Sequence, residues 1–167
     1  GCAGGSYTTI TMRVAGAASG LPAAVDGWHV HVGPRGGDAT TAAACGATAT
    51  GGHYDPECLG VDHPAAIGEL THRHGPLRSD MADGTTWTDS HLPLRGPNSI
   101  VGRSIVIHDT GGARIACATI EPAGAAGCQA PAATNLEGHA VAEFADGAIE
   151  FSLLFTESDS IGHAGGS

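Results

Sequence analysis

Alternating apolar and polar residues form the clearest pattern in this chain, and the pattern predicts short β-strands. Segments 7–14 (YTTITMRV) and 26–33 (DGWHVHVG) alternate in this way and are rich in β-forming residues. Residues 100–108 (IVGRSIVIH) give the most convincing strand, and 113–120 (ARIACATI) follows after the turn sequence DTGG. These last two segments therefore predict a β-hairpin.

The C-terminal part predicts a second hairpin. Segments 139–145 and 148–156 flank Asp146-Gly147, which is a strong two-residue turn signal. Residues 34–99 are instead rich in Gly, Pro, Asp and His and are read mostly as loop.

Within this loop, short strands are expected near 46–50 and 80–88. Seven or eight short strands joined by turns predict an all-β protein, an antiparallel sandwich or barrel.

Composition narrows the possible partners and compartments. The chain has 167 residues, the size of one ordinary domain, and a formal net charge of −10 with no lysine. Without a basic stripe, nucleic acid is excluded as a partner. No apolar run reaches the roughly eighteen residues of a membrane span, so no membrane-spanning segment is predicted. Five cysteines indicate an oxidising compartment, which predicts a secreted, extracellular or cell-surface protein.

Two histidines in one strand are the first candidate for chemistry. His29 and His31 are two residues apart in the predicted strand, so both rings project from the same face. Two neutral imidazoles at this spacing make half of a tetragonal copper site. The pair alone fits an exposed strand face equally well.

Four sequence blocks together resemble the copper/zinc superoxide dismutase family. They are GWHVH, Cys45 followed by GGHYDP, GRSIVIH and ARIAC, and they keep the family's order and nearly its spacing over about residues 7–120. The resemblance implies a Greek-key β-sandwich or flattened barrel of about eight strands. It also implies superoxide as substrate and one copper ion as cofactor. The implied copper ligands are His29, His31, His53 and His108.

The same resemblance assigns further roles. His53 occupies the position of the histidine that releases the metal on reduction, takes up a proton and returns it. Arg114 occupies the position of the arginine that guides and hydrogen-bonds superoxide, and a permanently charged guanidinium suits a small anion. Cys45 and Cys117 occupy the positions of the family's intramolecular disulfide. The partners of Cys2, Cys58 and Cys128 stay open.

Departures from the family pattern concern the zinc site. The stretch YDPECLGVDHPAAIGELTHRHG has Ala66 where the family has a zinc-binding histidine, and Glu69 stands in place of the aspartate. Only His63 remains as a candidate zinc histidine. One histidine and one carboxylate do not complete a closed four-coordinate site, so no zinc is expected.

A second departure is the short connection of residues 109–113, where zinc-containing members place a long charged loop. Both losses resemble the copper-only superoxide dismutases and the superoxide dismutase repeat proteins. In that group a carboxylate at the Glu69 position hydrogen-bonds the outer nitrogen of the histidine at the His53 position. Glu69 is thus expected to orient His53 in place of zinc.

The order of the blocks predicts a circular permutation. One strand, 7–14, precedes GWHVH, while HAVAEFADGAIEFSLLFTES near the C-terminus resembles the family's first hairpin. We therefore expect one domain over 1–167 in which 139–156 supplies that hairpin, pairing beside strands 7–14 and 113–120. A piece of a tandem array, with neighbouring repeats as partners, is the related possibility.

Three functions remain at this point. The first is copper-only dismutation of superoxide. The second is a non-catalytic copper-binding or structural module of a repeat protein, which the net charge of −10 and Ala66 favour. The third is a zinc protein using His53, His63 and Glu69. The remaining histidines are expected to be solvated, with His74 singled out because the copper-only group often has His-Gly there; they are His72, His74, His91, His139 and His163.

Overall fold

The structure is a computed structural model that describes residues 5–123 and 138–159 of the chain. These residues contain seven β-strands and three short helices. The strands are β1 (Ser6–Arg13), β2 (Val25–His31), β3 (Thr86–Asp89), β4 (Ser104–Asp109), β5 (Arg114–Pro122), β6 (His139–Asp146) and β7 (Ile149–Asp159), and the helices are α1 (Thr41–Ala44), α2 (Ala47–Thr50) and α3 (Leu70–His74).

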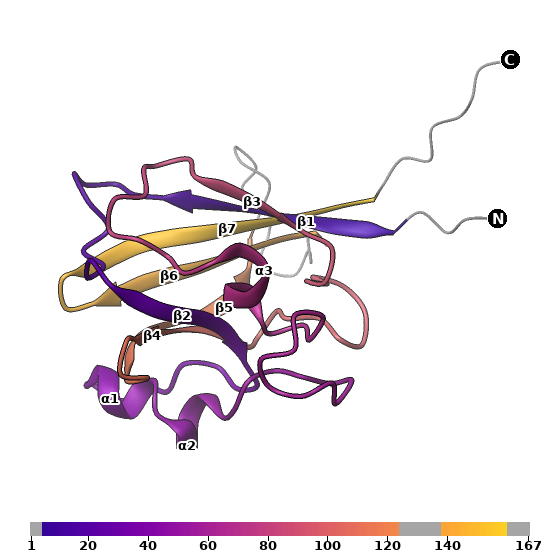
Figure 1. The fold of residues 1–167 in the computed structure, drawn as a ribbon, viewed down its shortest axis with the longest axis horizontal. Coiled ribbons are helices and arrows are strands. Elements are labelled where there is room, and N and C mark those ends of the chain that lie inside the picture. Colours follow the sequence, from indigo (N-terminus) through magenta and orange to yellow (C-terminus); the bar gives the residue numbers. More distant parts are fainter. Residues whose placement is uncertain (1–4, 124–137, 160–167) are drawn as a thin grey trace, which may run out of the picture.

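All seven strands form one antiparallel sheet in the order β2-β4-β5-β6-β7-β1-β3. The sheet curls until its edge strands β2 and β3 approach each other across the core (Figure 1). Trp28 on β2 and Trp87 on β3 meet there, with ring centroids 5.2 Å apart. Apolar side chains that alternate along the strands fill the interior of the curl. The prediction of an all-β antiparallel fold is confirmed.

The C-terminal hairpin lies in the middle of this sheet. β7 pairs with β1 from Ser6↔Asp159 to Arg13↔Ser152, and β6 pairs with β5 at Ile120↔Ala142. In Figure 1 the yellow strands β6 and β7 lie between β5 and β1. The hairpin therefore pairs beside the strands that the sequence analysis named, and it leaves neither β1 nor β5 as an open edge.

Helix α3 covers the opening between the two edge strands. The Trp28 amide donates to the Thr71 hydroxyl at 2.8 Å, and the Trp28 indole donates to the Gly75 carbonyl at 2.8 Å. On the other edge, the buried Arg73 guanidinium donates to Asp89 at 2.7 Å. The segment that carries Glu69 is thus attached to both β2 and β3, although the helix itself has only five residues.

Two expectations from the sequence are wrong. The strand expected near 46–50 is a helix: α2 occupies residues 47–50, in a stretch rich in alanine, the best helix former. The Thr40 side chain caps α1 by accepting the amide of Ala43. His74, expected to be solvated, is 11% exposed and its Nε2 lies 2.7 Å from Asp89. Its burial follows from the closure by α3.

Among the described residues, no helix is both long and apolar enough to cross a bilayer. His163 lies outside the described residues, as do Cys2 and Cys128.

Candidate metal centre

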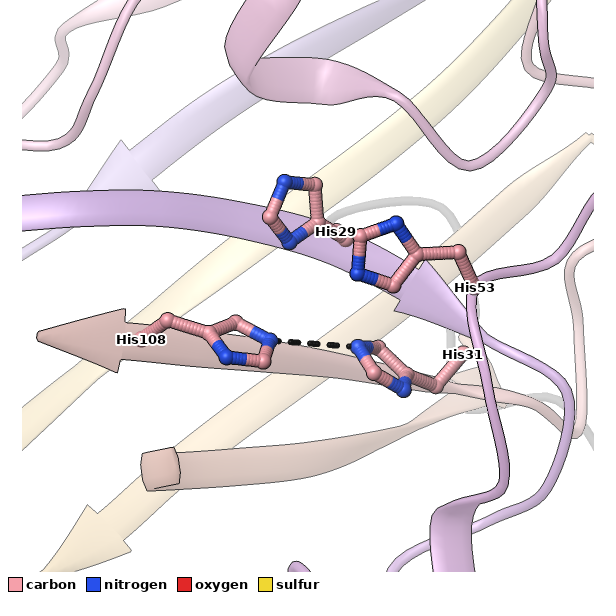
Figure 2. A group of neighbouring side chains, drawn as sticks. All are labelled: His29, His31, His53 and His108. Atoms are coloured by element: carbon pink, nitrogen blue, oxygen red, sulfur yellow. Dashed lines mark hydrogen bonds between the residues drawn. The ribbon is translucent and has the colours of Figure 1, made fainter. Parts of the chain in front are cut away.

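Four histidines from three separated segments meet on the outer side of β2 and β4. His29 and His31 project from one face of β2, and His108 lies near the end of the adjacent strand β4. His53 forms an isolated antiparallel bridge with His31, because residues 52–54 pair with the free edge of β2. One nitrogen from each ring lies within 4.8 Å of the others (Figure 2). We call these four residues the histidine cluster.

Two of the rings direct unprotonated nitrogens at each other. The Nδ1 atoms of His31 and His108 lie 2.9 Å and 3.2 Å from the carbonyls of Gly51 and Gly112. A carbonyl only accepts, so each Nδ1 carries the proton and each Nε2 keeps a lone pair. These two Nε2 atoms are 3.2 Å apart (Figure 2). Two acceptors at this distance require a cation or a proton between them.

The third ring has a buried nitrogen with no partner. His29 Nδ1 is inaccessible to solvent and makes no hydrogen bond, while its Nε2 lies 3.5 Å from the Thr71 hydroxyl. A buried polar atom without a hydrogen bond is costly and calls for an explanation. Gly27 leaves space for this ring, because a Cβ at that position would lie 2.6 Å from His29 Cε1. The orphaned nitrogen is the one that faces the cluster.

Glu69 holds the fourth ring. Its carboxylate is 1% exposed and accepts from His53 Nδ1 at 2.5 Å and from His72 Nδ1 at 3.1 Å. The same carboxylate lies 3.6 Å from His29 Nε2. Burial raises the pKa of Glu69, but the hydrogen bond from His53 and the neighbouring imidazoles outweigh it and lower the pKa to about 2. Glu69 is therefore ionised, and His53 Nε2 is left for the cluster.

Three rings of the cluster, those of His29, His31 and His108, are neutral at physiological pH. Burial lowers the pKa of His29 to about 4 and that of His31 to about 3, and it also lowers the pKa of His108. Proximity of the rings to one another and of Arg114 to His31 adds to this effect. Neutral imidazoles are the form that binds metals, so these rings have free lone pairs for a metal ion at this pH.

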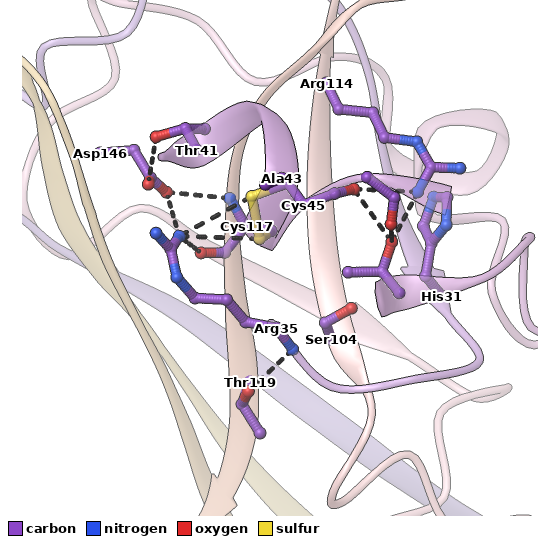
Figure 3. The surroundings of a disulfide bond; sticks show 12 residues. His31, Arg35, Thr41, Ala43, Cys45, Ser104, Arg114, Cys117, Thr119 and Asp146 are labelled. Atoms are coloured by element: carbon purple, nitrogen blue, oxygen red, sulfur yellow. Dashed lines mark hydrogen bonds and ion pairs between the residues drawn. A yellow bond between two sulfur atoms is a disulfide. The ribbon is translucent and has the colours of Figure 1, made fainter. Parts of the chain in front are cut away.

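Arg114, at the start of β5, lies beside the cluster (Figure 3). Its Nη1 donates to the Cys45 carbonyl at 3.0 Å and to the Thr50 hydroxyl at 2.5 Å, and its Nη2 donates to the Gly51 carbonyl at 3.0 Å. The Gly51 carbonyl also accepts from His31 Nδ1. One peptide group thus connects the guanidinium to a ring of the histidine cluster.

A disulfide anchors this segment. Cys45, which ends α1, is bonded to Cys117 on β5. Cys58 is exposed and is the free cysteine among the described residues.

Of the residues considered for zinc, His53 and Glu69 are in contact, but His63 lies apart from them. His63 is exposed, and its Nδ1 accepts the amide of Ala65. Ala66 is buried, and its methyl group cannot bind a metal. Asp62, Glu69 and His72 form a second group of potential ligands in the described chain, and His63 belongs to neither group.

Sequence reasoning missed two residues around the centre. Thr71 contacts both the β2 backbone and His29, and nothing in its sequence context distinguishes it from other loop threonines. Asp146 was read only as a turn residue, yet its side chain is buried against the disulfide. An acidic residue followed by glycine is explained by the turn alone, so no further signal was visible.

Comparisons with known proteins agree with this geometry. The family model for copper/zinc superoxide dismutase matches residues 4–133. A superoxide dismutase [Cu-Zn] 2 from Brassica juncea is 41% identical over 111 residues, and the match spans 63% of this chain and 63% of that relative's length.

Two structures of variants of superoxide dismutase 5 from Candida albicans share the fold. Their TM-scores are 0.50 and 0.52 at 22% identity, and the matches cover 78% and 77% of this chain and 100% and 98% of those chains. With four converging imidazoles and a family match over most of its length, the chain belongs to the copper/zinc superoxide dismutase family.

Proposed function

We propose that this chain binds one copper ion through the histidine cluster and dismutates superoxide to oxygen and hydrogen peroxide without a structural zinc. The observation that carries the proposal is the arrangement of the inward nitrogens. His29 Nδ1 is buried and orphaned, and the Nε2 atoms of His31 and His108 face each other as two acceptors. The lone pairs of these nitrogens have no hydrogen-bond donor, and a bound metal ion would accept them.

The donor set fits copper. Four neutral nitrogens from imidazoles suit both Cu(II) and Cu(I), whereas hard cations such as Mg²⁺ prefer oxygen ligands. Bound copper would supply the one-electron chemistry that the dismutation of superoxide needs. The protein supplies rigid rings, because an outer partner fixes the orientation of each one.

His53 is the ring suited to move a proton. Glu69 accepts from His53 Nδ1, so the proton on that atom stays in place and a second proton at Nε2 would form an imidazolium beside an ionised carboxylate. His53 can therefore hold a proton at Nε2 and give it to a reduced oxygen species.

Arg114 is the residue suited to bind the substrate. The net charge of −10 repels an anion globally, so a local positive charge beside the cluster matters. Arg114 keeps its charge at all relevant pH values, and three acceptors fix its guanidinium. We assign it the role of orienting superoxide.

The copper-only part of the proposal is supported by three features around His53. Its Nδ1 is engaged by Glu69 and is not free for a second metal. Ala66 offers a methyl group, and the His63 ring faces a loop amide. In this proposal the Glu69 carboxylate orients the His53 ring, as a zinc ion would otherwise do.

We further propose that 1–167 is one permuted domain, in which 139–156 takes the place of the family's N-terminal hairpin. The support is the insertion of β6 and β7 between β5 and β1. Secretion or surface location is proposed from the disulfide between Cys45 and Cys117, and neighbouring repeats of the same chain remain proposed partners.

The test is the dismutation rate of the copper-loaded protein, measured by pulse radiolysis. His53→Ala should lower the rate at least about 100-fold, the usual range for a lost proton-transfer group. His139→Ala, outside the histidine cluster on β6, is the matched control and should leave the rate unchanged. A wild-type rate equal to that of His53→Ala would refute dismutation.

Two measurements separate the other possibilities. Copper bound through nitrogen ligands in electron paramagnetic resonance, without turnover, would indicate the non-catalytic module. Elemental analysis of the purified protein tests for zinc: one zinc per chain would contradict the copper-only proposal.

A further inference from the structure

We propose that Asp146, at the turn of the C-terminal hairpin, is a positioning residue for Arg114. The inference rests on the proposed role of Arg114 in binding superoxide. Asp146 is not among the hydrogen-bond partners of the Arg114 guanidinium. It acts through the segment that holds the guanidinium, which contains helices α1 and α2.

The Asp146 carboxylate is 1% exposed and has a full set of donors (Figure 3). Its Oδ1 accepts from the Thr41 hydroxyl at 2.7 Å. Its Oδ2 accepts from Arg35 Nη1 at 2.7 Å and from the Cys117 amide at 3.0 Å. Burial raises the pKa of Asp146, but these three donors outweigh it and lower the pKa, so the group is an anion. We call Arg35, Thr41, Cys117 and Asp146 the Asp146 cluster.

These contacts fix the first end of the α1–α2 segment. Thr41 is the first residue of α1, and Cys117 carries the other half of the disulfide to Cys45 at the helix end. Arg35 donates to the Cys117 carbonyl at 2.9 Å as well. A helix of four residues has no stability of its own, so its place depends on such anchors.

The second end of the segment holds Arg114. All three acceptors of the guanidinium, Cys45, Thr50 and Gly51, lie at the ends of α1 and α2. The Thr50 hydroxyl also lies 3.1 Å from the Cys45 carbonyl, which ties the two helices together. A shift of α1 therefore moves the acceptors of Arg114.

The residue type at 146 separates this role from turn formation. Asn-Gly favours the same two-residue hairpin turn as Asp-Gly, so the turn does not require a negative charge. The charge is required by Arg35, whose Nη1 also lies 3.6 Å from the Cys117 sulfur in a half-buried position. Without the anion, the Arg35 guanidinium loses its charged partner and must find another position. We expect the segment between β2 and α1, which carries Arg35, to shift with it.

Asp146→Asn is therefore the informative variant, because it keeps size and turn preference and removes the charge. In the copper-loaded full chain we expect dismutation to fall about tenfold, since small misplacements of a positioning group have large kinetic effects. Azide, used as a small-anion probe, should bind to the copper-loaded protein more weakly. The copper content and the spin-resonance spectrum without azide should not change.

A double-variant cycle with Arg114→Gln distinguishes positioning from general destabilisation. If Asp146 acts through Arg114, then Asp146→Asn has no further effect on rate or azide affinity in the Arg114→Gln background. An equal loss in both backgrounds, or unchanged azide affinity and rate in the single variant, would overturn the proposal. Asp83→Asn, which breaks the exposed Arg13–Asp83 pair, is the matched control and should change neither quantity.

Thr41→Val keeps the proposal testable if Asp146→Asn does not fold. It removes one hydrogen bond to Asp146 and leaves the Arg35 pair intact. A smaller loss in the same two readouts, again absent with Arg114→Gln, supports the proposal, and wild-type values contradict it. Azide affinity is also measurable if the copper protein has no dismutase activity, so failure of the proposed function and failure of this inference can be distinguished.

Discussion

Two of the buried polar clusters in the described residues, the histidine cluster and the Asp146 cluster, differ in completeness. In the Asp146 cluster each carboxylate oxygen has a donor at hydrogen-bond distance. In the histidine cluster His29 Nδ1 has none, and two Nε2 atoms present lone pairs to each other.

This difference indicates which cluster takes a ligand. Buried polar groups are stable when every member is satisfied, and a half-satisfied network is destabilising. The complete cluster needs nothing more and holds two parts of the chain together. The incomplete cluster gains stability when a cation binds, so its folding and its chemistry are linked.

The largest expected effect tests the structural role of the complete cluster. Replacing Cys45 and Cys117 together by serine should lower the free energy of unfolding by about 4 kcal/mol, because the bridge closes a long loop in the unfolded chain. Urea unfolding of the metal-free protein measures it. A loss below about 1 kcal/mol would show that the cluster is held without the bridge.

Acid should act next on the incomplete cluster. The metal-free folded protein keeps His29 and His31 neutral down to pKa values of about 4 and about 3, whereas unfolded histidines titrate near about 6.5. The unfolded state thus binds more protons below this pH, and stability should fall as pH falls from about 6.5 toward about 4.

Urea midpoints at several pH values test this prediction. His29→Gln together with His31→Gln should flatten the decline in the same range, because glutamine does not titrate. A pH-independent midpoint between about 7 and about 4.5 in the wild-type protein would contradict the low pKa values.

Removing the charge of Arg114 should have a smaller effect, on the dismutation rate and on anion binding but not on copper binding. Arg114→Gln is expected to lower the dismutation rate about 10- to 100-fold. This is no larger than the usual loss in rate when one hydrogen-bond donor to a developing anion is removed. Copper affinity should stay the same, because Arg114 donates to carbonyls and a hydroxyl and not to the histidine rings. Arg78→Gln, whose exposed guanidinium pairs with Asp80 outside the histidine cluster, is the control. An equal loss in both variants would indicate a general electrostatic effect.

The smallest expected effect concerns the carboxylate that orients His53. Glu69→Gln keeps the size of the side chain and removes its charge. Copper affinity should fall about tenfold, the smaller of the losses usual when a metal ligand loses its hydrogen-bond partner. Competition with a copper chelator measures the affinity. Unchanged affinity and an unchanged spin-resonance spectrum would show that His53 is oriented without Glu69.

The strands of the sheet could be predicted from the sequence because each has a local cause. Strand β2 follows from the alternation in DGWHVH, and the β6–β7 hairpin follows from alternation on both sides of Asp146-Gly147. The segment of α1 and α2 was misread, because an alanine- and threonine-rich stretch of this length supports either strand or helix. Contacts from distant segments decide it, because the Thr50 hydroxyl donates to the Cys45 carbonyl and accepts from Arg114.

The candidate site divides in the same way. The two-residue spacing of His29 and His31 places both rings on one face whatever the rest of the fold does. The distance between Glu69 and His53 depends on α3, which is placed by its contacts to β2 and β3. The burial of His74 depends on the same contacts, and for this reason it was predicted incorrectly.

By itself, the sequence determined the strands of the sheet, the family and the four candidate histidines, because local periodicity and motif order are properties of the chain itself. Only the tertiary structure decided which ring nitrogens are left without partners, and that Asp146 is a buried anion rather than a turn residue. Hydrogen-bond satisfaction is a property of groups brought together from distant segments, and the fold alone specifies which groups those are.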